Sequence, residues 1–353
     1  MMSPNEGPKS KFRILCVDGG GIRGLISALL IAEIERLLQE RDGEDARIAD
    51  YFHLFSGTST GGLIALALTR PKAPPAAELA GFYTEDGPKI FDRSLMHELG
   101  SGWGTLAPKY DSGPLRDAVR RRLGNGDLAE ATSDLVVTAY DMTERAPYFF
   151  KRWKALEGSG EWNFSIVDAA LSTAAAPTYF PCHEPEKLKG HALVDGGVFA
   201  GNPTIAAIAE ALGRSSDPPA GLTLQDMFVV SVGTGEFEVG FPPSEVRGWG
   251  DLGWIAAGGD DPPILSAMLG GSSTGTDYWA HMLLNHERGK GLPGPDAVGH
   301  GKRYYRFQAQ LAKGIQMDDA SPKTLKLLAE VAQQLIADRQ ADIAAVVSHL
   351  ERI

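Results

Sequence analysis

The hydrophobic positions of the chain fall into short apolar runs separated by longer apolar or amphipathic stretches. The short runs have the length and β-rich composition of buried strands and lie at 12–17, 51–55, 134–140, 192–194 and 227–232. The longer stretches follow a helical pattern and lie at 25–38, 63–68, 166–174, 203–212 and 321–353. Because strands alternate with helices along most of the chain, the pattern predicts an α/β fold with a mostly parallel sheet.

Glycine and proline cluster at 71–75, 215–219 and 240–275, but none of these segments has the composition of an interdomain linker. We therefore expect a polar flexible tail over 1–11 followed by one domain over 12–353. Within that domain, residues 12–234 form a core that carries the strand-loop-helix units. A helical part over 255–353 is expected to pack on this core.

The first strand-to-helix junction is rich in glycine. Asp18 is followed by Gly19-Gly20-Gly21-Ile22-Arg23-Gly24, which fits the GxGxxG fingerprint. Backbone N–H groups and the positive end of the next helix suit an anion, either a pyrophosphate or the oxyanion of an acyl-transfer intermediate. A dinucleotide site also needs an acidic residue about 20 positions on, after a second strand. Here 40–45 lies in a charged helix end and loop, so that fingerprint is incomplete, and a non-catalytic dinucleotide-binding protein stays as the rival interpretation.

The second junction, Gly57-Thr58-Ser59-Thr60-Gly61, has the form of a nucleophile elbow between a strand and a helix. The same spacing recurs around Ser273, between Gly271 and Gly275, but in a stretch rich in Gly, Pro and Ser that predicts a flexible loop. Context therefore favours Ser59 as the nucleophile. Adjacent parallel strands bring their carboxyl-end loops to one edge of a sheet, where the first glycine loop would face this serine.

Asp195 ends the run at 192–194 and is followed by Gly196 and Gly197. His191 lies four residues earlier, about 13 Å away at ~3.3 Å per residue of strand, and cannot relay a proton between Asp195 and a serine. An acid that acts directly on the serine is the simpler hypothesis. The alternative is an Asp-Gly-Gly turn without a chemical role.

These motifs, in this order, resemble those of the patatin-like acyl hydrolases. Residues 18–24 are similar to the family's DGGGxRG motif, 57–61 to its GxSxG and 195–197 to its DGG. The supporting stretches are IADYFHLFSGTSTGG, GFYTEDGPKIF, STAAAPTYFP, VDGGVFAGNP and Met317-Asp318-Asp319-Ala320-Ser321. The likeness covers most of the chain, which makes it more specific than any single motif.

The resemblance implies a three-layer α/β/α sandwich of patatin type, with 12–353 as its catalytic domain. It implies a phospholipase A type of reaction in which Ser59 attacks an acyl ester of a glycerophospholipid or other lipid. Asp195 is then the general base without a histidine, and no metal or cofactor takes part. The residues that it assigns to the oxyanion hole are Gly19, Gly20 and Gly21. Those that support the motifs are Arg23, Gly24, Gly57, Gly61, Gly196 and Gly197.

Composition narrows the partners. A net charge of −11 argues against nucleic acid, which prefers a basic face. The chain has a polar start and lacks a run of 18 apolar residues, so we expect a cytoplasmic protein in transient peripheral contact with membranes. The scattered histidines predict no metal site, and Cys16 and Cys182 are expected as reduced core residues.

Three questions stay open at the level of sequence. Some relatives of this kind are phospholipases that cyclic nucleotides activate in bacterial antiviral defence, so a nucleotide activator is an alternative. Whether the chain associates into a homo-oligomer is the second question. The segment with Trp249 and Trp254 either meets lipid or is buried as core aromatics.

Overall fold

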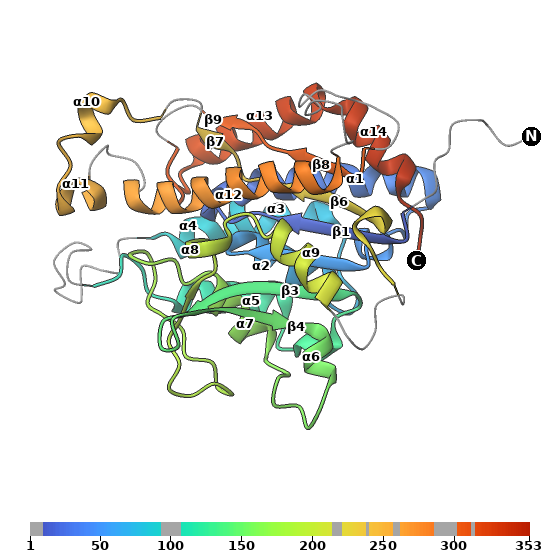
Figure 1. Ribbon diagram of the computed structural model, residues 1–353, viewed down its shortest axis with the longest axis horizontal. Helices are drawn as coiled ribbons and strands as arrows, with labels where there is room; N and C mark the ends of the chain where they lie inside the picture. Colours follow the sequence, from blue (N-terminus) through green and yellow to red (C-terminus); the bar gives the residue numbers. More distant parts are fainter. Residues whose placement is uncertain are drawn as a thin grey trace, which may run out of the picture.

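The fold is built on a central sheet with helices on both faces (Figure 1). The computed structural model describes residues 10–92, 107–213, 221–237, 240–256, 262–285, 302–311 and 315–353. Within them the strand order is β4-β3-β2-β1-β6-β8, and β5 pairs with β3 as the seventh strand. The strands are β1 (Phe12–Val17), β2 (Leu54–Thr58), β3 (Asp134–Asp141), β4 (Ala146–Lys151), β5 (Leu193–Asp195), β6 (Met227–Val232) and β8 (Tyr304–Phe307). A separate pair joins β7 (Glu236–Phe237) and β9 (Gln310–Leu311).

The sheet is mixed but mostly parallel, as predicted. Strands β1, β2, β3, β6 and β8 are parallel, whereas β4 and β5 both run antiparallel to β3. Both faces of β1 are buried, so its sequence FRILCV is continuously apolar except for Arg13. Leu15 and Val17 enter one core, and Ile14 and Cys16 enter the other.

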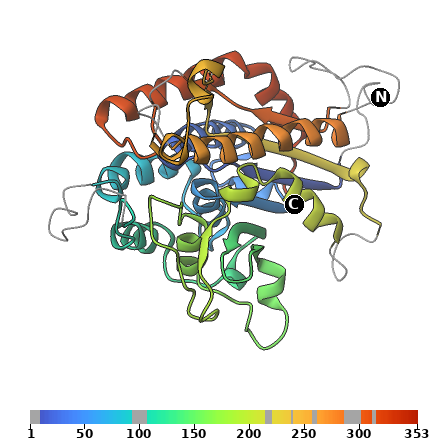
Figure 2. The same cartoon turned by 60° about the vertical axis from the view of Figure 1, so that its left-hand side comes forward.

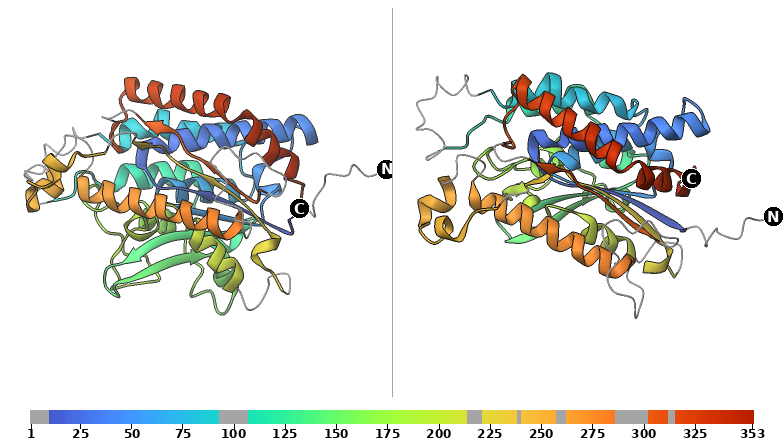
Figure 3. Two further views of the ribbon diagram at one scale, coloured as in Figure 1. Left: turned by 45° about the horizontal axis from the view of Figure 1, so that its top comes forward. Right: turned by 90° about the horizontal axis from the view of Figure 1, so that it is seen from above.

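Helices form the two outer layers (Figure 3). The N-terminal helices are α1 (Gly24–Asp42), α2 (Thr60–Thr69), α3 (Leu79–Gly81), α4 (Gly87–Ile90), α5 (Gly113–Leu123), α6 (Arg152–Leu156) and α7 (Ile166–Thr173). The others are α8 (Gly197–Ala200), α9 (Thr204–Gly213), α10 (Pro243–Val246), α11 (Asp251–Ala256), α12 (Pro263–Leu284), α13 (Pro322–Asp338) and α14 (Gln340–His349). The larger core lies under α1, α2, α5, α7 and α13, and the smaller one under α9 and α12. These layers confirm the three-layer α/β/α prediction.

The sequence did not predict β8, which is the strand at one edge of the sheet. Its sequence, YYRF, contains a buried arginine. The guanidinium of Arg306 donates to both carboxylate oxygens of Asp18, at 2.8 and 2.6 Å. Asp18 begins the glycine loop after β1, so this ion pair ties the loop to the edge strand.

Ser273 does not lie in a flexible loop, and that prediction was wrong. It belongs to α12, and its hydroxyl donates to Asp18 at 2.9 Å and accepts from Arg306 at 3.0 Å. The close approach in this region is at Gly201, whose N–H donates to the Ser272 hydroxyl at 2.9 Å and where a Cβ atom would overlap that hydroxyl. The serines of α12 are therefore packed and hydrogen bonded, whereas Gly270 and Gly271 have open space around them.

Three further sequence predictions concern single segments. Cys16 is buried in β1 as expected, but Cys182 is exposed, so the expectation of a core position was wrong for it. The single domain over 12–353 stays a prediction, and all but two residues of the tail over 1–11 lie outside the described residues. Among the helices of the described part, none combines the length and apolar character needed to cross a bilayer.

The buried ion pair predicts an unequal response to substitution. Arg306→Met leaves the Asp18 carboxylate buried without its cation, so the free energy of unfolding should fall by about 3–5 kcal/mol. Ser273→Ala removes one hydrogen bond from the same cluster and should cost about 1 kcal/mol. Urea unfolding of both variants measures this difference. An Arg306→Met protein within about 1 kcal/mol of the wild type would contradict the role of the pair.

Candidate active site

Ser59 lies in a sharp turn between β2 and α2. Its backbone angles are φ 54° and ψ −126°, a strained region for a residue with a side chain. The turn is held on both sides: the Ser59 N–H donates to the Thr173 hydroxyl at 2.8 Å, and the Leu63 N–H donates to the Ser59 carbonyl at 3.1 Å. This is the geometry of a nucleophile elbow.

The glycines on either side of Ser59 are required by close backbone contacts. A Cβ atom at Gly57 would overlap the carbonyl of Gly61, and a Cβ at Gly61 would overlap the carbonyl of Val17 in β1. The GxSxG spacing therefore follows from the packing of the elbow against itself and the neighbouring strand.

Strand β3 brings Asp195 next to Ser59. Along one edge of β3, Thr58 of β2 pairs with Thr138, and the next residue, Ala139, pairs with Asp195 of β5. Strand β5 therefore continues along β3 where β2 ends, in the opposite direction. The Thr58 and Thr138 hydroxyls are hydrogen bonded at 2.7 Å, and a Cβ at Gly196 would overlap the Thr138 hydroxyl.

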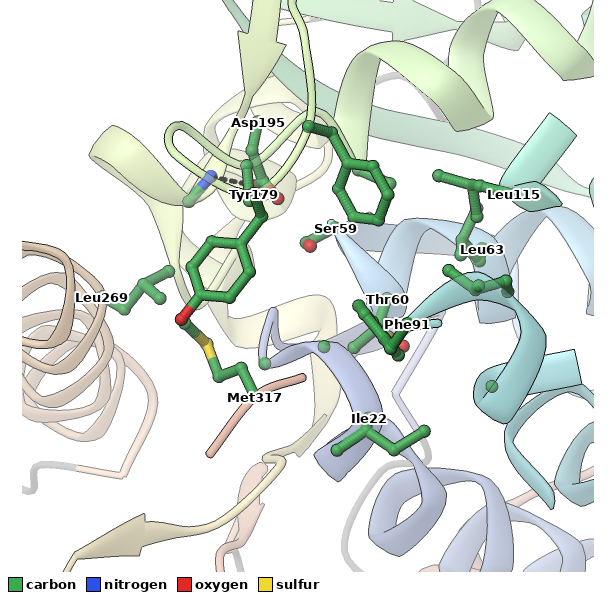
Figure 4. Close-up of a pocket in the computed structure, with 18 of the residues that line it drawn as sticks. Ile22, Ser59, Thr60, Leu63, Phe91, Leu115, Tyr179, Asp195, Leu269 and Met317 are labelled. Atoms are coloured by element: carbon green, nitrogen blue, oxygen red, sulfur yellow. Dashed lines mark hydrogen bonds between the residues drawn. The ribbon is translucent and has the colours of Figure 1, made fainter. Parts of the chain in front are cut away.

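The Asp195 carboxyl group is almost fully buried, with 4% of the residue exposed. Burial raises its pKa to about 7, against the opposing effects of the Ser59 hydroxyl and the Gly197 N–H, both of which favour the ionised form. The Gly197 N–H lies 2.7 Å from Oδ1 (Figure 4). A carboxyl group with a pKa near 7 can accept and return a proton at neutral pH.

Two of the three glycines that were predicted to form an oxyanion hole line the same pocket as Ser59. Gly20 and Gly21 lie at its wall, and within the described residues their N–H groups have no acceptor. The N–H of Gly19 instead donates to the Gly201 carbonyl at 2.9 Å, which takes Gly19 out of the predicted donor set. Thr60, which the sequence analysis did not single out, lines the pocket and also has an N–H without an acceptor in this part of the chain. Its position directly after the elbow serine is the signal that could have identified it.

The glycine loop is held by segments far away in the sequence. The N–H of Ile22 donates to the Met317 carbonyl at 2.8 Å, and the Thr234 hydroxyl donates to the Gly19 carbonyl at 2.6 Å. Gly21 has φ 59°, and a Cβ there would overlap Met317. Arg23 is buried beneath the loop, 5.2 Å from the Phe237 ring. Gly24 makes room for the hydrogen-bonded hydroxyls of Thr60 and Tyr83.

In the described part of the chain, the histidines lie away from this pocket. His191 pairs with Asp141 at 2.6 Å, and His183 pairs with Asp168 at 2.8 Å. His53 accepts from the Arg13 N–H at 3.1 Å, and His349 stacks on Phe228. His281 packs against Tyr304 near the end of α12, whereas the pocket residues of that helix, Leu265 and Leu269, lie near its start. His97, His286 and His300 lie outside the described residues.

The pocket above Ser59 and Asp195 is mostly apolar. It encloses about 760 Å³ of empty space, part of it open to solvent. Figure 4 shows Ile22, Leu63, Phe91, Leu115, Tyr179 and Met317 around Ser59. Among the described residues, no three metal-ligating side chains converge anywhere in the structure. The pocket therefore offers a long apolar group a lining that ends at one serine and one carboxyl group.

The fold and the pocket define a three-layer α/β protein with an elbow serine at the carboxyl edge of its sheet. The family model described as "Patatin-like phospholipase" matches residues 15–208. Patatin-like protein 2 of Arabidopsis thaliana is 34% identical over 92% of this chain and 82% of its own length. Patatin-04/09 of Solanum tuberosum is 32% identical over 92% of this chain and 83% of its own. The chain belongs to the patatin-like phospholipase family.

Family membership alone does not decide activity. Another relative, described as "Probable inactive patatin-3-Kuras 1" of Solanum tuberosum, is 31% identical over 92% of this chain and 86% of its own length. Among solved structures, Legionella pneumophila VipD aligns with a TM-score of 0.42 and 14% identity, over 94% of this chain and 67% of that one. The reaction must therefore be argued from the residues of the pocket.

The raised pKa of Asp195 predicts how the stability of an Asp195→Asn variant depends on pH. Between pH about 4 and about 7, the carboxyl group of the folded protein binds a proton that the unfolded chain has lost. The contribution of this group to the free energy of unfolding of the wild type therefore falls with rising pH, by at most about 1.4 kcal/mol per pH unit. The neutral amide has no such dependence, so the stability of Asp195→Asn relative to the wild type should rise from pH 4 to 7. Urea unfolding across this range measures it, and a constant difference would show that the pKa is not raised.

Proposed function

We propose that the protein is a lipid acyl hydrolase of phospholipase A type, with Ser59 as nucleophile and Asp195 as general base. The observation that carries the proposal is that Ser59 and the buried Asp195 carboxyl group lie together in the lining of an apolar pocket, where β2 and β5 meet along one edge of β3. In the described part of the chain, the pocket contains no histidine that would act between them. Membership of the patatin-like phospholipase family supports the same class of reaction.

In the acylation step, the Ser59 oxygen attacks the carbonyl carbon of the ester while Asp195 takes the hydroxyl proton. The negative charge that develops on the carbonyl oxygen is placed among the N–H groups of Gly20, Gly21 and Thr60. Each donor to such an oxyanion typically contributes ~10²- to 10³-fold in rate. As the intermediate collapses, the protonated Asp195 returns its proton to the departing lysophospholipid alcohol. The acyl group stays on Ser59.

In the deacylation step, Asp195 takes a proton from water as the water oxygen attacks the acyl carbonyl. The same donors hold the second oxyanion. The bond to the Ser59 oxygen then breaks, Asp195 gives the proton to that oxygen, and the fatty acid is released. One carboxyl group with a pKa of about 7 serves both steps, because it is neither a strong acid nor permanently charged at neutral pH.

The pocket lining favours a fatty-acyl substrate. Side chains from α2, the segment 82–91, α5 and α12 surround Ser59 with aliphatic and aromatic groups. Burial of each methylene of an acyl chain contributes about 0.8 kcal/mol. Such a lining offers little to a polar substrate, which supports a lipid ester.

The dinucleotide-binding alternative has less support. The Gly19 N–H is already bonded to Gly201. Strand β2 ends at Thr58 and is followed by Ser59, whereas the second strand of a dinucleotide site carries an acid at its end. Glu40 lies in the last turns of α1 and Asp45 in the loop after it. Calorimetry with NAD and FAD should show no binding. Micromolar affinity for either, without ester hydrolysis, would favour the alternative.

A fluorophosphonate probe tests the nucleophile. The probe should label Ser59 in the wild type, with loss of fluoride from phosphorus, and should fail to label Ser59→Ala. Ser273→Ala, the matched variant at the other GxSxG sequence, should remain labelled because Ser273 is hydrogen bonded to Asp18 and Arg306 in α12. Mass spectrometry of tryptic peptides identifies the modified serine. Labelling of Ser273 in the wild type would relocate the nucleophile.

Release of fatty acid from mixed phospholipid vesicles tests the dyad. Ser59→Ala and Asp195→Asn should each lose at least about 10²-fold in turnover while remaining folded, since removal of a general base typically costs this much. Single His→Gln changes at all eight histidines should keep most of it, including His97, His286 and His300. The assay is run with and without a panel of cyclic dinucleotides, which tests the activated alternative. One folded histidine variant as inactive as Ser59→Ala would refute the dyad.

A further inference from the structure

The short helix α11 and the first turns of α12 expose large apolar side chains. Leu252 and Ile255 of α11 are 79% and 52% exposed, and Ile264 and Met268 of α12 are 46% and 39% exposed. Trp254 of α11 is also exposed, at 38%. The two helices are in contact and lie at the same end of the molecule, which is at the left of Figure 1 and is turned toward the viewer in Figure 2. We call these five residues the apolar rim.

The apolar rim is continuous with the lining of the pocket. Leu265 and Leu269 of α12 line the pocket, and Figure 4 shows Leu269 near its wall. Ile264 and Met268 precede them by one residue each. Because neighbouring residues of a helix are turned by about 100°, the same two turns of α12 present one pair to the pocket and the other pair to solvent.

Aromatic packing holds α11 in place. Trp249 packs between Phe241 and Trp254, with ring centroids 4.8 and 5.3 Å away. The sequence had suggested Trp249 and Trp254 equally for lipid contact. In the structure Trp249 packs against other aromatic rings, whereas Leu252, Trp254 and Ile255 are exposed to solvent. Tryptophan next to aliphatic side chains is typical of the boundary between water and lipid.

The charges around the apolar rim select the kind of lipid surface. Over 240–256 and 262–285, the charged side chains are Arg247 and the acids Glu245, Asp251 and Asp277. Anionic headgroups are usually bound by clusters of lysine and arginine, which this part of the chain does not have. The whole chain carries a net charge of −11 and would be repelled by an anionic bilayer.

From these observations we propose that the apolar rim inserts into the surface of a zwitterionic bilayer without net charge and places the pocket mouth against it. This inference rests on the proposed function, because it supplies the route by which a lipid ester leaves the bilayer for Ser59. Insertion removes the exposed side chains of the apolar rim from water. A lipid that leaves the bilayer at this point then contacts Leu265 and Leu269 in the pocket lining. A second copy of the chain is the competing occupant.

The test uses a Ser59→Ala background, so that vesicles stay intact. The rim variant combines Leu252→Gln, Ile255→Gln, Ile264→Gln and Met268→Gln. The control variant combines Met142→Gln and Leu156→Gln, which are 55% and 56% exposed elsewhere on the surface. Co-sedimentation with phosphatidylcholine vesicles should show at least a tenfold weaker partition for the rim variant and an unchanged one for the control, because partition scales with the apolar area that is buried. Raised salt or added phosphatidylserine should not strengthen wild-type binding.

With Ser59 intact, the rim variant should hydrolyse a soluble short-chain ester as fast as the wild type. If that rate falls too, the pair Leu252→Gln and Ile255→Gln, which leaves the sequence of the pocket helix α12 unchanged, decides by the same two assays. The proposal is overturned if the rim variant binds vesicles like the wild type, if binding needs anionic lipid, or if the control loses as much. It is also overturned if sedimentation shows a wild-type dimer that the rim variant converts to monomer. Rim-dependent vesicle binding without any ester hydrolysis would instead reject the proposed function and leave the surface standing.

Discussion

The proposed chemistry depends on one constraint, the placement of the buried Asp195 carboxyl group beside Ser59 in the pocket. The two residues come together because two strands share one edge of β3: β2 pairs with that edge up to Thr138, and β5 pairs with it from Ala139. Each strand delivers its last residue to the same point from opposite directions. Burial there raises the pKa of the carboxyl group to about 7, and the same burial lowers the stability of the folded protein once the group is ionised. The ionised carboxyl group therefore lowers the free energy of unfolding, and the packing of the surrounding sheet must offset this loss.

The second constraint lies behind the glycine loop. In the proposed mechanism the N–H groups of Gly20 and Gly21 stay free to bind the oxyanion. The loop is therefore held in place by hydrogen bonds with other segments of the chain. Asp18 anchors its start to Arg306 of β8 and Ser273 of α12, and Met317 holds its far end through Ile22. These contacts come from segments more than 200 residues downstream. The C-terminal third of the chain thus stabilises the oxyanion loop and, through α12, lines the pocket.

Sequence reasoning succeeded where one strand meets one helix. The strands at 12–17 and 227–232 and the helices after the glycine loop and the elbow were predicted from local apolar patterns, because each contains a run of apolar residues that the fold buries. It failed where a distant partner decides the structure. Strand β8 was missed because it contains Arg306, whose burial depends on the ion pair with Asp18. Ser273 was assigned to a loop because the glycines around it are typical of loops, and no local pattern reveals its hydrogen bonds with Asp18 and Arg306. No local pattern reveals that the Gly19 N–H is bonded to Gly201, or that the Thr60 N–H at the pocket has no acceptor in the described part of the chain.

The pH dependence of serine acylation tests the central claim most directly. The rate at which a fluorophosphonate modifies Ser59 should follow one ionisation with a pKa of about 7 and reach its plateau above it, because only the ionised Asp195 can take the serine proton. In Asp195→Asn the rate should be at least about 10²-fold lower and should lose this limb. If the limb instead persists in Asp195→Asn, or disappears on substitution of a single histidine, then the base is another residue and the account is wrong.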